Sequence, residues 1–245
     1  MPLTLDNLLI TQGDFSLRAD LAIPKGARVA VIGASGSGKS TLLNTIAGFI
    51  APDTGRVLWN GADLTPLPPG ARPLSILFQD QNLFPHLSVA QNVGLGLRPD
   101  LRLSADQRGA VASALARVGL AGTEARRPAQ LSGGQQSRVG LARVLLRARA
   151  MILLDEPFAA LGPALKAEML ALVAQIADET GATVLMVSHD PDDARAICPL
   201  SVVIEAGLAH PPVPTGPLLD NPPPGLADYL GRHFATPSQR TGSSL

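Results

Sequence analysis

The sequence is poor in the features that mark secreted, membrane-spanning and nucleic-acid-binding proteins. It has a single cysteine, Cys198, so no internal disulfide can form, and a reducing compartment fits this composition. Its 20 basic and 20 acidic side chains balance, which leaves no overall basic field to attract nucleic acid. No apolar run approaches the ~18 residues that a membrane-spanning helix needs. The first residues lack a basic segment, so we expect no signal peptide.

What the sequence does contain is a set of short apolar runs separated by helical segments. The 245 residues are 46% hydrophobic, enough for one large α/β domain or for a core with an inserted subdomain. Runs rich in leucine and β-branched residues predict strands of a parallel sheet covered by helices, at 28–32, 75–78, 151–154, 183–187 and 201–204. A helix is expected to begin near Gly38, and the Asn60-Gly61 pair predicts an antiparallel hairpin.

Two further segments have helical periodicity. Residues 163–180 begin with a proline, carry one apolar stripe and stop at Gly181, which predicts a core-packed helix. Residues 105–118 are alanine-rich and helical in period, and strand signals vanish around them, so we expect an inserted helical subdomain at about 80–139 of a domain spanning 1–210. The chain is rich in proline beyond Gly207, which predicts an irregular tail at 211–245.

The clearest binding motif is Gly-x4-Gly-Lys-Ser, placed between a predicted strand and a predicted helix. Its glycines let the backbone wrap a phosphate, and the helix N-terminus adds partial positive charge. Lys39 is expected to reach the β- and γ-phosphates, Ser40 to coordinate Mg²⁺ and Thr41 to support the α-phosphate. The motif comprises Gly33, Ala34, Ser35, Gly36, Ser37, Gly38, Lys39 and Ser40.

Two other strands end in side chains suited to nucleotide chemistry. Asp155 and Glu156 follow the run 151–154, and His189 closes the run 183–187, at the sheet edge where α/β proteins bind ligands. An acidic pair at a strand end is often merely solvated, but the phosphate loop favours a site. We expect Asp155 to hold the Mg²⁺ shell, Glu156 to act as general base and His189 to contact the γ-phosphate.

The order and spacing of these motifs resemble the ATP-binding cassette (ABC) ATPases over about residues 3–209. The resemblance implies an α/β fold: a P-loop NTPase (RecA-like) core with a parallel sheet, an antiparallel β subdomain and an inserted helical subdomain. It implies that Gln79 contacts Mg²⁺ and the attacking water. Leu131–Gln135 resembles the family's signature motif, so the resemblance implies contacts to the ATP of a second copy from Ser132, Gly133, Gly134 and Gln135.

The resemblance also implies partners and a location. It implies ATP and Mg²⁺ as ligands, a homodimer of ATPase subunits, two transmembrane permease subunits and, indirectly, a periplasmic solute-binding protein, with no nucleic acid. The subunit would lie at the cytoplasmic face of the inner membrane. Residues 78–97 resemble the ATPase subunits of bacterial thiamine importers, which implies an ATP-hydrolysing translocase for thiamine and its phosphates.

Other functions remain open. An importer ATPase for iron, a polyamine or sulfate would carry the same motifs. An ABC ATPase acting on DNA or ribosomes is less consistent with the sequence, because those proteins usually have long coiled coils or tandem cassettes. A GTP-binding switch protein should carry an Asn-Lys-x-Asp motif, and this sequence has none.

The sequence departs from the family in three places, of which the mildest is the continuation of the signature as Gln135-Gln136-Ser137-Arg138, where Arg138 is kept. An aromatic residue that stacks on adenine is absent around Thr11-Gln12, and Phe15 is the nearby substitute. The D-loop, usually Ser-Ala-Leu-Asp, reads Ala-Ala-Leu-Gly at 159–162, and the missing carboxylate removes a contact across the dimer. Coupling between the two ATP sites is therefore expected to differ.

Overall fold

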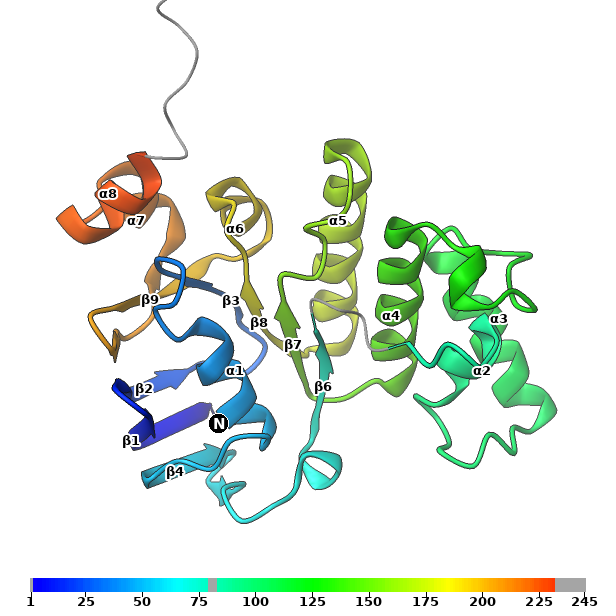
Figure 1. Cartoon of the computed structure of the whole chain (residues 1–245), viewed down its shortest axis with the longest axis horizontal. Coiled ribbons are helices and arrows are strands. Elements are labelled where there is room, and N and C mark those ends of the chain that lie inside the picture. The colour runs from blue at the N-terminus through cyan, green and yellow to red at the C-terminus, as the bar shows by residue number, and fades with distance from the viewer. Residues whose placement is uncertain (1, 79–82, 232–245) are drawn as a thin grey trace, which may run out of the picture.

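The computed structural model describes residues 2–78 and 83–231, and it confirms the predicted α/β class (Figure 1). The strands are β1 (Leu3–Gln12), β2 (Phe15–Ile23), β3 (Arg28–Ile32), β4 (Thr54–Trp59), β5 (Ala62–Asp63), β6 (Leu74–Leu77), β7 (Met151–Asp155), β8 (Thr183–Val187), β9 (Leu200–Glu205), β10 (Leu208–Ala209) and β11 (Val213–Pro214). The α-helices are α1 (Lys39–Ala47), α2 (Val89–Gly94), α3 (Ala105–Arg117), α4 (Gly133–Arg147), α5 (Pro163–Thr180), α6 (Pro191–Ile197), α7 (Thr215–Asp220) and α8 (Pro224–Gly231).

The sheet has a parallel part and an antiparallel part. Its order is β5-β4-β1-β2-β10-β9-β3-β8-β7-β6, and β11 pairs with β9. Neighbours from β9 to β6 are parallel, whereas β2, β1, β4 and β5 pair in antiparallel fashion. Because parallel strands need crossover connections, helices cover the parallel part, and the carboxyl ends of β3, β7 and β8 meet at one edge.

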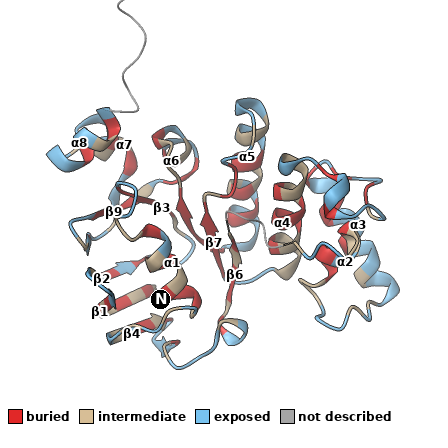
Figure 2. Cartoon of the chain, in the orientation of Figure 1, coloured by how far each residue is buried: buried red, intermediate tan, exposed pale blue. Residues whose placement is uncertain are grey.

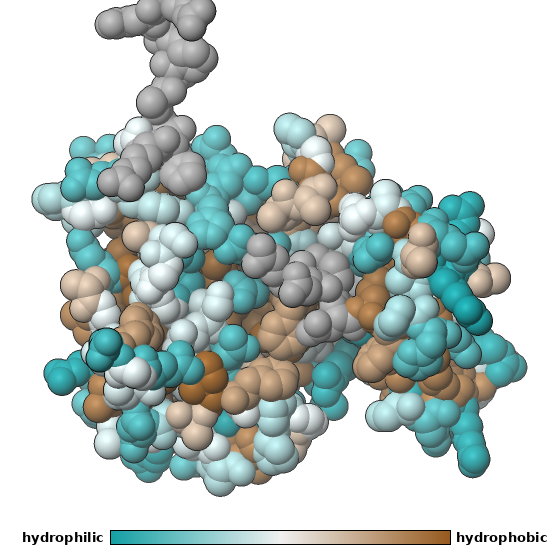
Figure 3. Space-filling model, viewed as in Figure 1, coloured by the Kyte–Doolittle hydropathy of each residue, from teal (hydrophilic) through white to brown (hydrophobic). Residues whose placement is uncertain are grey.

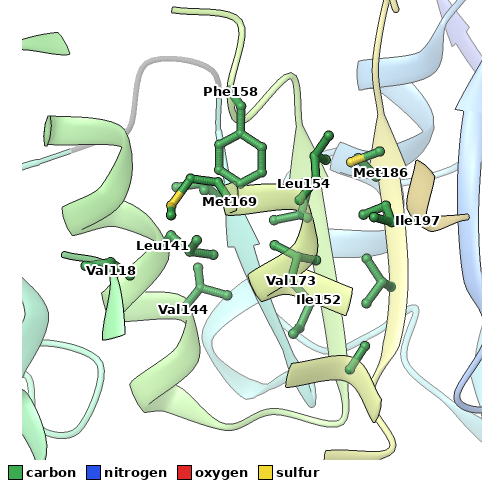
Figure 4. Packing of buried hydrophobic residues seen from close by; sticks show 14 of the residues in the cluster. Val118, Leu141, Val144, Ile152, Leu154, Phe158, Met169, Val173, Met186 and Ile197 are labelled. Carbon is green, nitrogen blue, oxygen red and sulfur yellow. The ribbon is translucent and has the colours of Figure 1, made fainter. Parts of the chain in front are cut away.

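Side chains on the two faces of the sheet enter two separate apolar clusters. In β3, Ala30 and Ile32 join one cluster while Val29 and Val31 join the other, as strand alternation requires. The first cluster joins the sheet to α4, α5 and α6, and its packing around Phe158 and Met169 is shown in Figure 4. Figure 2 shows the buried residues concentrated on the strands and on the inward faces of these helices.

The second cluster lies between the sheet, α1 and the antiparallel strands. Its helix α1 is held at the carboxyl end by Arg72, which is 2% exposed. The guanidinium donates to the carbonyl oxygens of Thr45 and Ile46, each at 2.8 Å, and to two carbonyls of the loop 64–67. A cation at a helix carboxyl end satisfies carbonyls that have no partner inside the helix. Arg72 thereby fixes the helix that follows the phosphate loop.

The helices α2 and α3 lie at the end of the molecule away from β1, β2 and α8 (Figure 1). Helix α3 confirms the helical prediction for 105–118, and no strand interrupts the described residues between β6 and β7. Each of α2, α3 and α4 begins with a serine whose side chain accepts a hydrogen bond from the backbone three residues later. Within the described residues, no helix is both long enough and apolar enough to cross a membrane.

The core strands were predicted within one residue at either end, and α5 was predicted at 163–180, where it lies. The hairpin of β4 and β5 is confirmed, with Asn60 and Gly61 at φ values of 53° and 84° in its turn. The strands β1 and β2 were not identified from the sequence. A bulge at Asn7, whose φ is 48°, shifts the register of β1 between Leu5 and Leu8 and breaks its alternation.

The expectation of an irregular tail after residue 210 was wrong for its described part. Helices α7 and α8 occupy this region, and Leu226 and Leu230 of α8 are 3% and 2% exposed in the cluster that packs α5 and α6. Proline marked this segment as irregular, but Pro224 stands at the first helical position, where its missing N–H costs nothing. The following leucines, four residues apart, fix α8 on the core.

Candidate functional site

The phosphate loop lies between the end of β3 and the start of α1, as the motif predicted. Gly36 and Gly38 have φ values of 77° and 104°, which favour glycine, and Gly38 is the residue immediately before the helix. A β-carbon on Gly33 would come within 2.4 Å of the carbonyl oxygen of Ile204. The backbone therefore needs glycine at these positions to form its turn at the helix N-terminus.

Lys39 lies beneath this loop and is 5% exposed. Its Nζ donates to the carbonyl oxygens of Gly33 and Ala34 at 2.7 and 2.8 Å. Burial lowers the pKa of Lys39, while the charges of Glu156 and Asp155 oppose that shift. The hydroxyl of Ser37 is buried in the same loop without a hydrogen-bond partner. An anion in the loop would give the Ser37 hydroxyl an acceptor that the described residues do not supply.

Asp155 ends β7 beside the phosphate loop. Its Oδ1 accepts a hydrogen bond from the Ser40 hydroxyl at 3.1 Å. Burial raises the pKa of Asp155, and the Ser40 hydrogen bond opposes that shift. A hydroxyl and a carboxylate that meet beside a phosphate site are oxygen ligands of the kind Mg²⁺ prefers.

Glu156 and His189 contact each other directly. Glu156 has a φ of 47°, in the left-handed region, and its N–H donates to the carbonyl oxygen of Val187 at 3.1 Å. Its Oε1 lies 2.5 Å from Nε2 of His189. The other ring nitrogen, Nδ1, lies 3.2 Å from the hydroxyl of Tyr229 in α8. The structure therefore joins the ends of β7 and β8 through a carboxylate–imidazole pair.

One open hollow of about 400 Å³ brings most of these groups together. It is lined by Gln12, Phe15, Ser35, Gly36, Gly38, Lys39, Ser40, Thr41, Glu156 and His189. Phe15 packs against the loop so closely that a β-carbon on Gly38 would lie 2.6 Å from its ring. Figure 3 shows that the face viewed there mixes hydrophilic and hydrophobic side chains. The lining of the hollow thus combines the glycine-rich loop and Lys39 with the aromatic ring of Phe15.

The segment Ser132–Gln135 lies at the start of α4 and does not line this hollow. Its side chains form a reciprocal cap: Gln135 N–H donates to Ser132 Oγ at 3.2 Å, and Ser132 N–H donates to Gln135 Oε1 at 3.0 Å. Gly133 and Gly134 open the helix, where backbone N–H groups have no acceptor within the helix. The structure thus separates these residues from the phosphate loop of the same chain.

The D-loop packs against that same helix start. A β-carbon on Gly134 would lie 2.8 Å from Cδ2 of Leu161, so Leu161 sits directly over the helix opening. The next residue, Gly162, precedes α5 and makes no side-chain cap. The carboxylate missing from this sequence would have stood at that junction.

The sequence reasoning missed some contacts of the site. The contact of Tyr229 with His189 was not predicted, because Tyr229 lies 40 residues beyond His189 in a segment expected to be irregular. The ion pairs of Lys166 were not predicted either. Its Nζ lies 2.7 Å from carboxylate oxygens of both Asp190 and Asp193. Its position in the first turns of α5 carries no local signal of that contact. Gln79, predicted to contact Mg²⁺ and water, lies outside the described residues.

Comparison with protein families gives a match to the family described as ABC transporter over residues 17–159. The Thiamine import ATP-binding protein ThiQ of Cereibacter sphaeroides is 63% identical over 94% of this chain and 99% of its own length. The ThiQ of Ruegeria sp. is 59% identical over the same shares, and that of Brucella suis is 49% identical over 93% of this chain and 95% of its own length.

Solved structures with the same fold include two of the cassette MJ0796. One is described as a dimeric post-hydrolysis state of this ATP-binding cassette bound to ADP and Pi, with 29% identity and a TM-score of 0.77. The other is described as a dimeric bacterial ABC transporter cassette, with 30% identity and a TM-score of 0.77. Each match covers 87% of this chain and 98% of that cassette.

Proposed function

Because this chain belongs to the ABC transporter family, we propose that it is the ATP-binding and ATP-hydrolysing subunit of a bacterial importer for thiamine and its phosphates. The observation that carries the proposal is the meeting of Lys39, Glu156 and His189 in the hollow at the phosphate loop. A glycine-rich loop for the phosphates, a carboxylate to accept a proton and an imidazole to donate a hydrogen bond are the parts that phosphoryl transfer to water requires.

ATP binding begins at the loop before α1. The backbone N–H groups of the loop and the α1 N-terminus hold the phosphates, and Lys39 turns its ammonium from the carbonyls of Gly33 and Ala34 to the β- and γ-phosphates. Thr41 supports the α-phosphate. Ser40 and Asp155, which already contact each other, would hold Mg²⁺, whose role is to neutralise phosphate charge. Gln79 would join them there.

Hydrolysis uses the pair Glu156 and His189. Oε1 of Glu156 lies 2.5 Å from Nε2 of His189, so each group is the hydrogen-bond partner of the other. A γ-phosphate entering between them takes the hydrogen bond of His189 and releases Glu156 to accept the proton of the attacking water. Glu156 can therefore act as the general base only when the γ-phosphate is bound.

A second copy completes the site in this proposal. Ser132–Gln135 lies away from its own phosphate loop, and its helix start offers N–H groups and partial positive charge suited to a γ-phosphate. ATP held by one copy and covered by the helix start of the other would close a homodimer. Support comes from the dimeric cassettes of the same fold. Closure of the dimer then moves α2 and α3 against two transmembrane permease subunits at the cytoplasmic face of the membrane. On the other side of the membrane, a periplasmic solute-binding protein delivers the solute to the permease.

Thiamine as the solute rests on the three related thiamine import proteins, because the solute itself does not contact this chain. The test is uptake of labelled thiamine by a bacterium that lacks its own copy of this gene. The wild-type chain should restore uptake, and Lys39→Ala should not. Restored uptake of iron, a polyamine or sulfate, with thiamine uptake unchanged, would contradict the choice of solute and leave the ATPase assignment standing.

Phe15 is the residue we expect to stack on the adenine ring. Its ring forms a side of the hollow next to Gly38, and Gln12 lies on the same lining. Phe15→Leu should weaken ATP binding by about tenfold, because stacking of a base on an aromatic ring contributes about 1–3 kcal/mol. Titration calorimetry with ATP measures the change.

Inorganic tripolyphosphate, which has no base, provides the control for this variant. Its affinity should stay within about twofold of the wild-type value if the phosphate loop is intact. An equal loss for tripolyphosphate and ATP would mean that Phe15 shapes the loop rather than holding the base.

A further inference from the structure

Helix α8 brings a tyrosine hydroxyl to the back of the histidine in the site. The Tyr229 hydroxyl lies 3.2 Å from Nδ1 of His189 and 3.3 Å from the main-chain oxygen of the same residue, so its single proton can be given to either atom. Tyr229 is half-buried, and burial raises its pKa, so its hydroxyl keeps its proton at neutral pH. Leu226 and Leu230 are buried in the apolar cluster against which Tyr229 packs, and they anchor α8 there.

The protons in this contact can be assigned from the chemistry of the three groups. An ionised carboxylate only accepts hydrogen bonds, so Glu156 favours a proton on Nε2 of His189. In the neutral imidazole Nδ1 is then an acceptor, and the Tyr229 hydroxyl is the donor that faces it. The other neutral tautomer would place a lone pair of Nε2 against the carboxylate at 2.5 Å. The hydroxyl therefore favours the tautomer that carries its proton on the side of the hollow.

We propose that Tyr229 is a positioning residue that holds His189 in the tautomer with the proton on Nε2, ready to donate to the γ-phosphate. The inference rests on the proposed role of His189 in ATP hydrolysis and adds the residue that sets its hydrogen-bonding state. Helix α8 would thus contribute to the active site, because it carries the Tyr229 hydroxyl.

The loop around His189 is held independently of Tyr229. Ser188 Oγ donates to Asp193 at 2.6 Å and accepts from the N–H of Asp190 at 3.1 Å. Lys166, from α5, bridges the carboxylates of Asp190 and Asp193. Removing the Tyr229 hydroxyl should therefore change the hydrogen bonding of the imidazole without releasing the backbone of the loop.

The test compares Tyr229→Phe with the wild-type full-length chain. We expect kcat for ATP hydrolysis to fall about fivefold, the size expected for one lost hydrogen bond, while KM for ATP stays within about twofold. The control is Thr215→Val, which removes a buried hydroxyl from α7 that is bonded to Ser201 at 2.8 Å. This control should leave kcat unchanged even if it lowers the melting temperature.

A second readout uses the nucleotide-free protein and so does not depend on hydrolysis. Nitrogen-15 NMR of labelled histidines, at about pH 8.5 where an ordinary imidazole is neutral, reports which ring nitrogen carries the proton. The signals of His189, assigned by loss in His189→Asn, should show a proton on Nε2 in the wild type and a mixed population in Tyr229→Phe. Unchanged His189 signals in Tyr229→Phe, or an equal loss of kcat in Thr215→Val, would overturn the proposal. A wild-type chain that shows the expected signals but hydrolyses no ATP would contradict the proposed function instead.

Discussion

Lys39→Ala is expected to weaken ATP binding by about 100-fold or more. The ammonium group lies under the phosphate loop with two carbonyl acceptors within 2.8 Å, poised to bond the phosphates instead. Hydrogen bonds to charged groups contribute about 1.5–3 kcal/mol each, so the loss of two accounts for at least this factor. Equilibrium dialysis or calorimetry with MgATP measures the affinity.

The matched control is Lys25→Ala, which removes an exposed lysine in the turn before β3. It should bind ATP as the wild type does. An unchanged affinity in Lys39→Ala would refute the assignment of the loop to phosphate binding, because the alanine leaves the backbone cradle but removes its cation.

Local constraints made the phosphate loop and the strand ends predictable from sequence. Because this loop needs glycine at Gly33, Gly36 and Gly38, few other sequences can form it. The position of its lysine is set by the helix that follows. Asp155 ends one short, wholly buried strand and His189 lies two residues beyond another, and parallel strands must present their carboxyl ends together. The order of the motifs was therefore enough to place the phosphate loop and His189 at one hollow, with Asp155 beside Ser40.

The contacts that depend on distant parts of the chain could not be predicted in this way. Tyr229 meets His189 only because Leu226 and Leu230 dock α8 on the core, and no local pattern states where a short helix will dock. The proline content of the segment also suggested irregular structure, although Pro224 begins a helix. Similarly, the clamp of Lys166 on Asp190 depends on the packing of α5 beside α6.

The structure also clarifies the effect of Gly162. The sequence showed only that a carboxylate is missing from the D-loop. In the structure this residue opens α5 without a side-chain cap, while Leu161 beside it packs on Gly134 at the start of α4. The D-loop and the segment Ser132–Gln135 are thus one contiguous surface, and a change in either is expected to alter the proposed dimer contact.

Glu156→Gln should abolish most ATP hydrolysis while leaving ATP binding intact. A glutamine oxygen can still accept the hydrogen bond that Nε2 of His189 now gives to the carboxylate, so the geometry at 2.5 Å is expected to persist. The amide cannot accept a proton from water, and loss of a general base lowers the rate about 10²–10⁴-fold. A phosphate-release assay at saturating MgATP measures the rate.

The same variant tests the dimer, because ATP that is bound and not hydrolysed should hold two copies together. Size-exclusion chromatography with light scattering should show a dimer in MgATP and a monomer in MgADP, since a ligand shifts an equilibrium only toward the state it binds more tightly. Glu168→Gln, an exposed change on α5, should stay monomeric at low concentration because it still hydrolyses ATP. A Glu156→Gln chain that remains a monomer in saturating MgATP would mean that Ser132–Gln135 does not cover a neighbour's nucleotide. Lys39→Ala can be added to the Glu156→Gln chain. Loss of the dimer in this double variant would show that the nucleotide, and not the protein surface alone, joins the two copies.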